Sequence, residues 1–196
     1  MAITIEDIKQ LRDATQVSVA ECKNALKESG GDFERAVEIL RKRGTLKAQA
    51  KESRAVGSGI IEAYVHLGGR VGVLLEIRCE TDFVARNEGF KALARDIAMQ
   101  IAAMSPVCVK PEDIPTDIIA RERRIWEESM GLQNKPSELR EKIILGKEQS
   151  YYKEACLLQQ SFIKNEDISV QQLIDEAIAR LGENIQVARF SRFEIV

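Results

Sequence analysis

An alternating apolar strand that runs into a long amphipathic helix constrains the fold of this chain most. Apolar residues occupy every second position from 71 to 77, the spacing of a strand with one buried face. The segment Glu88–Met104 then carries apolar residues at helical spacing, in a stripe wide enough to cover a sheet. Because the strand face and the helix stripe both need an apolar partner, the pattern predicts an α+β domain with this helix packed on the sheet.

An earlier alternating segment supplies a partner for this strand. Ile61, Ala63 and Val65 share one face of a segment that begins at Gly59. A Gly68-Gly69 turn separates this segment from the second strand. The pattern predicts an antiparallel hairpin with a buried face.

The second half of the chain is predicted to add helices and one more strand. Helical patterns begin near Thr116 and Ser137, the second with a breaker at Gly146, and they form a helical insertion at about residues 112–165. A last helix follows Ser169, and Ile185–Val196 has the period of a strand. We expect that strand to complete a three-stranded antiparallel sheet.

The first part of the chain reads as three short helices with tight turns. The first helix is expected over Thr4–Asp13, and Ser18 and Asp32 are suitable N-caps for the second and third. The third helix is expected to end near Gly44. A bundle with so few residues has a marginal core when it stands alone. The pattern therefore predicts a small three-helix bundle, similar in shape to ubiquitin-associated (UBA) modules, that docks on a partner.

These patterns divide the chain into three parts. Residues 1–44 form the three-helix docking domain, residues 45–56 a linker, and residues 57–196 the α+β core domain with its helical insertion. The linker has no apolar stripe and several basic residues, which is typical of a solvated segment. RNA binding through this linker is an alternative that the residues leave open.

Charge and cysteine usage exclude several function classes. The formal net charge of −2 gives no surplus that would favour nucleic acid or a membrane surface as the main partner. The chain has no apolar run long enough to span a bilayer and no signal pattern at its N-terminus, so we expect a cytoplasmic protein. Its four cysteines lack CxxC spacing and it has one histidine, so no metal site is expected.

The residues that enzymes use are missing or badly placed. No GxxxxGK[ST] or GxGxxG motif opens a helix, so the chain has no phosphate loop of its own. A triad of Cys79, His66 and Asp82 is disfavoured, because His66 and Cys79 lie at the far ends of the hairpin, roughly 30 Å apart along the strand. We therefore expect a protein that is not an enzyme and uses no cofactor.

A sharp corner joins the second strand to the long helix. Thr81 is a good N-cap, and Asp82 and Phe83 follow it in a short helical turn. From the residues alone, Phe83 fits either a core position just after a strand or an exposed position that enters a partner's pocket. Asp82 fits an acidic residue in the first turn, whose negative charge interacts favourably with the helix dipole.

Two segments of the sequence resemble a known family. Residues 11–26 (LRDATQVSVAECKNAL) and 76–87 (EIRCETDFVARN) are similar to the two signature motifs of bacterial elongation factor Ts, in the same order and separation. Shorter agreements follow at residues 97–103, 135–136, 160–162, 182–185 and 192–194. The resemblance covers the whole chain.

The resemblance implies a guanine nucleotide exchange factor of translation elongation. Such a protein binds GDP-bound elongation factor Tu, disturbs its Mg²⁺ and phosphate site, and promotes GDP release so that GTP can bind. Residue by residue, the implied partner contacts are Thr81, Asp82, Phe83 and Val84 at the corner; Arg12, Val19, Ala20 and Lys23 on the docking bundle; and Gln100, Leu181 and Gly182 as weaker contacts.

The chain departs from the family pattern at several positions. Family members often have glycines where Gln16 and Ser18 stand and a methionine pair where Val19 and Ala20 stand, which implies a smaller docking surface. Gln100 replaces a frequent histidine. Arg78 and Ser161 replace a usual asparagine and a usual proline.

The length of the chain matches short-form members of the family. By resemblance, two copies associate through the sheet region of the core domain and bind two partners, with neither a membrane nor direct nucleic-acid contact expected. The alternative is a UBA-like or RNA-binding interaction module without exchange activity.

Overall fold

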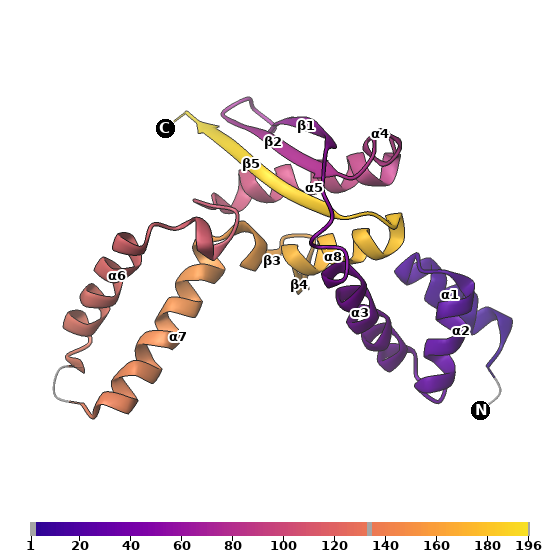
Figure 1. Ribbon diagram of the computed structural model, residues 1–196, viewed down its shortest axis with the longest axis horizontal. Helices are drawn as coiled ribbons and strands as arrows, with labels where there is room; N and C mark the ends of the chain where they lie inside the picture. The colour runs from indigo at the N-terminus through magenta and orange to yellow at the C-terminus, as the bar shows by residue number, and fades with distance from the viewer. Residues whose placement is uncertain (1–2, 133–134, 196) are drawn as a thin grey trace. The chain divides into compact units, whose positions relative to one another are not determined.

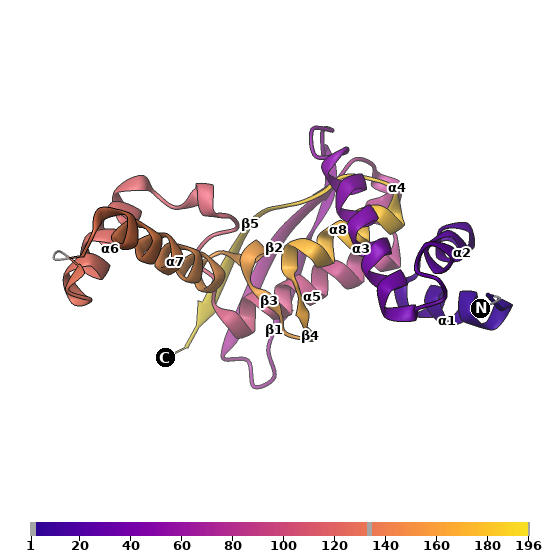
Figure 2. The ribbon, with the colours of Figure 1, turned by 90° about the horizontal axis from the view of Figure 1, so that it is seen from below.

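The computed structural model describes residues 3–132 and 135–195 (Figure 1, Figure 2). The chain forms two compact units, each built from segments that are distant in sequence. The first unit comprises Met1–Ile60, Ile77–Ala94 and Gln172–Gln186, and the second comprises Ile61–Glu76, Arg95–Gln171 and Val187–Val196. All candidate partner contacts except Gln100 belong to the first unit.

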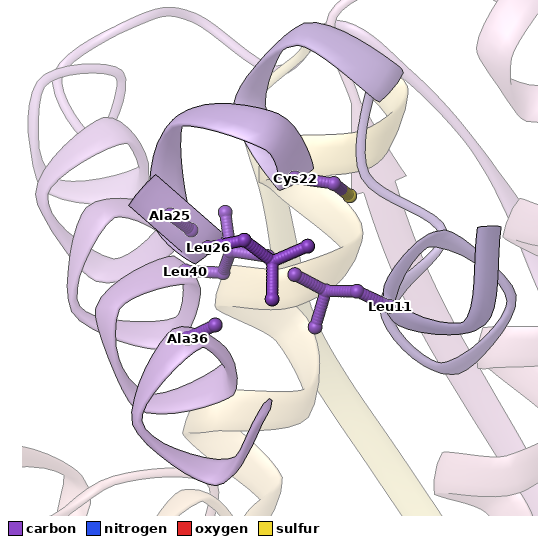
Figure 3. Packing of buried hydrophobic residues seen from close by; sticks show 6 residues of the cluster. All are labelled: Leu11, Cys22, Ala25, Leu26, Ala36 and Leu40. Carbon is purple, nitrogen blue, oxygen red and sulfur yellow. The ribbon is translucent and has the colours of Figure 1, made fainter. Parts of the chain in front are cut away.

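The N-terminal bundle consists of α1 (Ile5–Thr15), α2 (Val19–Glu28) and α3 (Phe33–Gln49). The two predicted N-caps, Ser18 and Asp32, are confirmed, and Thr4 caps the first helix in the same way. Side-chain oxygens of Thr4, Ser18 and Asp32 each accept a backbone N–H from the first turn of the helix that follows. The buried side chains that meet between the helices are Leu11, Cys22, Ala25, Leu26, Ala36 and Leu40 (Figure 3).

The predicted end of the third helix near Gly44 is wrong, because α3 continues to Gln49. Gly44 is buried in the middle of the helix, and a Cβ added there would lie 3.7 Å from the Cβ of Ala179 on α8 (Val170–Leu181). Gly44 thus serves close helix packing rather than termination. An ion pair between Arg41 and Glu176 (3.5 Å) joins the same two helices.

The sheet contains β1 (Ser58–Val65), β2 (Val71–Cys79) and β5 (Ile185–Glu194) in the order β1-β2-β5. The predicted α+β class with a three-stranded antiparallel sheet is confirmed. The last strand ends at Glu194, and Val196 of the predicted strand lies outside the described residues.

One face of the sheet is covered by α5 (Glu88–Met104), as the apolar pattern predicts (Figure 2). Val73 and Leu75 of β2 and Ile97 and Ile101 of α5 are buried. The guanidinium of Arg192 on β5 donates two hydrogen bonds of 3.2 Å to the carbonyl of Ala102 on α5. Strand and helix are thus joined by both apolar packing and hydrogen bonds.

The predicted buried face of the first strand is wrong. Ile61 and Val65 are 69% and 68% exposed, and Ala63 is exposed as well. The amide of His66 donates to the carbonyl of Val71, and this register places Ile61, Ala63 and Val65 opposite even-numbered residues of β2. Because neighbours across a sheet share a face, these three side chains lie on the uncovered side.

The helical insertion contains α6 (Thr116–Ser129) and α7 (Ser137–Ala155). The predicted break at Gly146 is wrong, because α7 runs through this residue without interruption. Arg123 of α6 binds Glu148 and Glu141 of α7, and these ion pairs lie on both sides of Gly146 in the sequence. Interhelical contacts thus outweigh the roughly 1 kcal/mol cost of one helical glycine.

Short elements complete the second unit. They include two 3₁₀ turns, η1 (Pro111–Asp113) and η3 (Leu157–Gln159). A small antiparallel pair, β3 (Ser161–Phe162) and β4 (Asn165–Ser169), was not predicted. Among the described parts of the chain, no helix is long and apolar enough to cross a membrane.

Candidate partner-binding surface

The corner after β2 is built around a one-turn helix, α4 (Asp82–Ala85). Thr81 has extended backbone angles, and its hydroxyl accepts the amide of Val84 at 3.4 Å. Val84 and Ala85 are buried and hold this turn against the fold. The last two residues of this helix face inward, and the first two, Asp82 and Phe83, face solvent.

Phe83 lies on the solvent side of this turn. Its side chain is 82% exposed, so it is not a core residue of its own chain. Asp82 is also exposed, and its carboxylate lies 3.8 Å from the guanidinium of Arg86. An exposed pair at this distance contributes little to stability, so the carboxylate can exchange Arg86 for another cation at small cost.

Val84 does not share this exposure. Only 5% of its surface is accessible, although the family resemblance places it among the partner contacts. Its side chain anchors the corner from inside. Of the four implied corner contacts, only Thr81, Asp82 and Phe83 are exposed.

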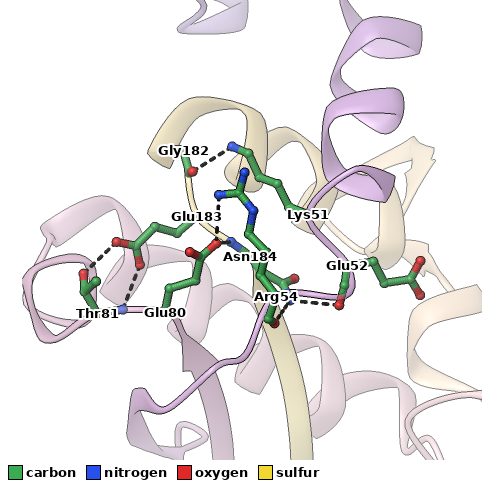
Figure 4. Close-up of polar contacts among 8 residues, drawn as sticks. All are labelled: Lys51, Glu52, Arg54, Glu80, Thr81, Gly182, Glu183 and Asn184. Atoms are coloured by element: carbon green, nitrogen blue, oxygen red, sulfur yellow. Dashed lines mark hydrogen bonds and ion pairs between the residues drawn. The ribbon is translucent and has the colours of Figure 1, made fainter.

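Glu183, which the sequence interpretation did not single out, holds the corner from the end of α8 (Figure 4). One carboxylate oxygen accepts the Thr81 amide at 3.0 Å, and the other accepts the Thr81 hydroxyl at 2.6 Å. Hydrogen bonds to an ionised acceptor are stronger than neutral ones. Both polar groups of the N-cap residue are therefore fixed by one side chain that lies 102 residues away in sequence.

Asn184 extends this contact to the segment after α3 (Figure 4). Its backbone amide donates to the carboxylate of Glu80 at 2.6 Å. Its buried side-chain amide donates to the backbone carbonyls of Glu52 (3.1 Å) and Arg54 (2.8 Å). Lys51 donates to the carbonyl of Gly182 at 2.7 Å. Burial, together with the charge of Arg54, lowers the pKa of Lys51. The loop that ends α8 thus joins two other segments of the first unit, the corner and the segment after α3.

Cys79, at the end of β2, supports the corner through a hydrogen bond from its side chain. Its buried thiol donates to the carbonyl of Thr81 at 3.2 Å. Burial, and then the charge of Glu183, raise the pKa of this thiol, so it stays protonated at neutral pH. A protonated, hydrogen-bonded thiol is a structural anchor rather than a nucleophile.

The predicted docking residues lie on the outside of the N-terminal bundle. Arg12, Val19, Ala20 and Lys23 are all exposed, and Val19 at the first position of α2 is 52% exposed. Val19 and Lys23 are four residues apart and share one face of α2. The buried core of the bundle is formed by other positions of the same helices, so these four side chains are not needed for its packing.

Leu181 and Gly182 mark the end of α8. Gly182 has a left-handed φ of +85° and donates to the carbonyl of Ile178, which closes the helix. Leu181 is half-buried, and its Cδ2 would lie 3.9 Å from a Cβ added at Gly89, near the start of α5. The end of α8 therefore lies beside the segment that follows the corner.

Gln100 is not available to a partner. It is fully buried in the second unit, where its amide nitrogen donates to Gln160 and to the carbonyl of Ser161, both at 3.1 Å. Its oxygen accepts the amide of Ile163 at 2.9 Å. These bonds satisfy the side chain internally, and Gln100 is buried where the family resemblance implies an accessible contact residue.

No metal cluster accompanies the corner. Within residues 3–132 and 135–195, no three His, Cys, Asp or Glu side chains are arranged to hold a metal ion. What the surface offers is an exposed ring and carboxylate on a rigid support, which suits insertion into another protein.

Comparison with known proteins identifies the family. The family model described as elongation factor TS matches residues 4–196. Elongation factor Ts of Carboxydothermus hydrogenoformans is 49% identical over 98% of this chain and 89% of its own length. The corresponding protein of Fervidobacterium nodosum is 49% identical over 100% of this chain and 99% of its own length, and that of Heliobacterium modesticaldum is 48% identical over 98% and 90%. The chain belongs to the elongation factor Ts family.

Proposed function

We propose that this chain releases GDP from elongation factor Tu by inserting the Asp82–Phe83 corner beside the partner's magnesium site. Membership of the family makes the chain a nucleotide exchange factor of translation elongation, with elongation factor Tu as its partner. The observation that supports the mechanism is the 82% exposure of Phe83 on a corner whose backbone is fixed by Thr81 and Glu183.

The free energy for this step comes from burial of the ring. Moving an exposed Phe side chain into a partner's apolar pocket supplies roughly 1.5–3 kcal/mol, available to shift the groups that hold Mg²⁺ and phosphate. Linkage is reciprocal. If binding of this chain lowers the affinity of elongation factor Tu for GDP by some factor, bound GDP lowers the affinity of elongation factor Tu for this chain by the same factor. The exchange factor therefore consumes nothing, and GTP binding displaces it.

The N-terminal bundle is proposed as the docking module. In this proposal the bundle of α1, α2 and α3, which ends at Gln49, forms a UBA-like domain that binds the GTPase domain through Arg12, Val19, Ala20 and Lys23. The segment from α3 to residue 56 is the linker. Exposure of all four side chains supports this role. Leu181 and Gly182 add contacts at the end of α8, near the segment that follows the corner.

A homodimer through the core domain, residues 57–196, is part of the proposal. The uncovered face of the sheet exposes Ile61, Val65, Leu74 and Phe193, an apolar group that a monomer would leave in water. Contiguous exposed apolar side chains mark interaction surfaces, and two copies of such a face can cover each other. We infer a 2:2 complex with elongation factor Tu in the cytoplasm.

Release of a fluorescent GDP from elongation factor Tu tests the proposal. Increasing concentrations of the chain should accelerate release strongly, and Phe83→Ala should lower the rate reached at saturation. Equal saturating rates for the two proteins would remove the role of Phe83. An absence of acceleration by the unmodified chain would remove the exchange function itself.

A further inference from the structure

Two cysteines of the second unit lie against each other at the base of the helical insertion. The Sγ atoms of Cys108 and Cys156 are 3.4 Å apart, although 48 residues separate them in sequence. Cys108 precedes η1 and α6, and Cys156 directly follows α7. The pair therefore stands where the chain enters and leaves the insertion.

The backbone holds this pair in register without help from the thiols. Cys108 and Cys156 form an isolated parallel β-bridge. The amide of Leu157 donates to the carbonyl of Cys108 at 3.0 Å, and the amide of Val107 donates to the carbonyl of Ala155 at 2.9 Å. Because these bonds fix both Cα positions, the two side chains stay within reach of each other while the bridge persists.

We propose that Cys108 and Cys156 form an oxidisable dithiol that closes to an intrachain disulfide when the protein meets a low-molecular-weight disulfide. The sulfurs need to approach by only about 1.4 Å to reach a covalent S–S length of about 2.05 Å. This modification site is independent of the exchange surface, none of whose proposed residues takes part in it.

The reaction begins at Cys108, which is partly exposed, whereas Cys156 is buried. The Cys108 thiolate attacks one sulfur of the oxidant RSSR, which forms a mixed disulfide and expels RS⁻. The Cys156 thiolate then attacks the Cys108 sulfur and expels the second RS⁻. The two thiol protons end on the two leaving thiolates, so two Cys–SH and one RSSR give one Cys–S–S–Cys and two RSH.

The surroundings of the two thiols make this reaction slow. The pair lies beside an apolar cluster that includes Ile114 and Tyr151. Burial raises the pKa of Cys108, and burial, with its hydrogen bond to Cys108, raises the pKa of Cys156 to about 12. Thiolates are the reactive species, so these thiols react slowly with a disulfide at neutral pH.

Oxidation would lock the insertion at its base. A disulfide between residues 108 and 156 encloses α6 and α7 in one covalent loop, which restricts the unfolded chain and raises the melting temperature. Cys22 and Cys79 provide controls within the same chain. Both are buried, and their thiols donate to the carbonyls of Val17 and Thr81.

The test treats the folded full-length chain with excess oxidised glutathione, removes the reagent, and counts free thiols after denaturation. The count should fall from four to two. Peptide mapping without reductant should recover one crosslinked pair containing Cys108 and Cys156, and a reductant should restore both thiols and the original melting temperature. Cys22→Ser should leave the crosslink and its rise in melting temperature intact, whereas Cys156→Ser and Cys108→Ser should each abolish both.

Two results would overturn the proposal. One is a chain that keeps four free thiols, or carries only glutathione adducts, after prolonged exposure. The other is a crosslink that uses Cys22 or Cys79 or joins two chains. A melting temperature that rises equally in Cys156→Ser would assign the stabilisation to the reagent instead of the disulfide.

Discussion

Replacing Glu183 should slow nucleotide exchange while leaving docking almost unchanged. The carboxylate accepts both polar hydrogens of Thr81, at 3.0 and 2.6 Å, and thereby orients the turn that presents Phe83. Gln retains one acceptor oxygen and replaces the other by a donor, so Glu183→Gln loses one bond. Ala in the same place loses both.

The size of the effect follows from these bonds. A hydrogen bond to a charged acceptor contributes about 1.5–3 kcal/mol, and the lower value applies because Glu183 is half-exposed. A loss of about 1.5 kcal/mol corresponds to roughly a tenfold lower population of the ordered corner. We therefore expect the saturating rate of GDP release to fall by up to about tenfold for Glu183→Gln, and further for Glu183→Ala.

The assay is release of fluorescent GDP from elongation factor Tu over a range of chain concentrations. The half-saturating concentration should change little, because Glu183 lies outside the docking bundle. Glu166→Gln, at an exposed position on β4, is the matched control and should behave like the unmodified chain. Unchanged saturating rates for both Glu183 variants would refute the positioning role, as would a loss confined to the half-saturating concentration.

Three further outcomes are expected. Arg12→Ala should raise the half-saturating concentration in the same assay more than it lowers the saturating rate, and the reverse pattern would count against docking through the bundle. Val65→Asp should shift the chain from dimer to monomer in sedimentation velocity, whereas an unchanged sedimentation coefficient would place the dimer contact elsewhere. Burial alone would raise the pKa of Glu148, but bonds from Tyr152 and Arg123 lower it overall, so the ionised carboxylate stabilises the fold above its unfolded pKa of 4.5. This contribution should disappear as the pH falls through the lower folded pKa. The melting temperature of Glu148→Gln should therefore fall less on acidification than that of the unmodified chain. Identical melting-temperature profiles against pH for the two proteins would contradict this role of Glu148.

Local signals in the sequence predicted the starts of the helices well. Ser18 and Asp32 cap their helices as predicted, because a capping hydrogen bond depends only on residues within one turn. Glycine was a poorer signal for helix ends. Gly44 and Gly146 both lie inside helices, because contacts with α8 and with α6 outweigh the modest helical cost of glycine.

The face of a strand was harder to predict than the strand itself. The sequence showed the alternation at Ile61, Ala63 and Val65, but the hairpin register decides which set of residues faces inward. A shift of one residue exchanges the two faces, and nothing local to β1 specifies that shift. In the structure the more apolar set of β1 side chains is exposed, and this exposure supports the proposed dimer contact.

The candidate site was predicted in part. Pattern alone left Phe83 undecided between core and surface, and the family resemblance favoured the exposed position that the structure has. Gln100 lies within the apolar stripe of α5, one residue before buried Ile101, and that position predicts burial better than its similarity to a contact residue did. The bonds from Glu183 to Thr81 span 102 residues, and no pattern in a single sequence encodes such a pair.

The most direct test of the mechanism compares binding of the chain to nucleotide-free and to GDP-bound elongation factor Tu. The ratio of the two dissociation constants measures how strongly the chain and GDP weaken each other. Phe83→Ala should reduce this ratio by roughly 10- to 150-fold, the equivalent of about 1.5–3 kcal/mol of lost burial. Leu67→Ala removes another exposed apolar side chain, 93% accessible, and should leave the ratio unchanged. An equal ratio for Phe83→Ala and the unmodified chain would contradict the claim that this ring opens the partner's nucleotide site.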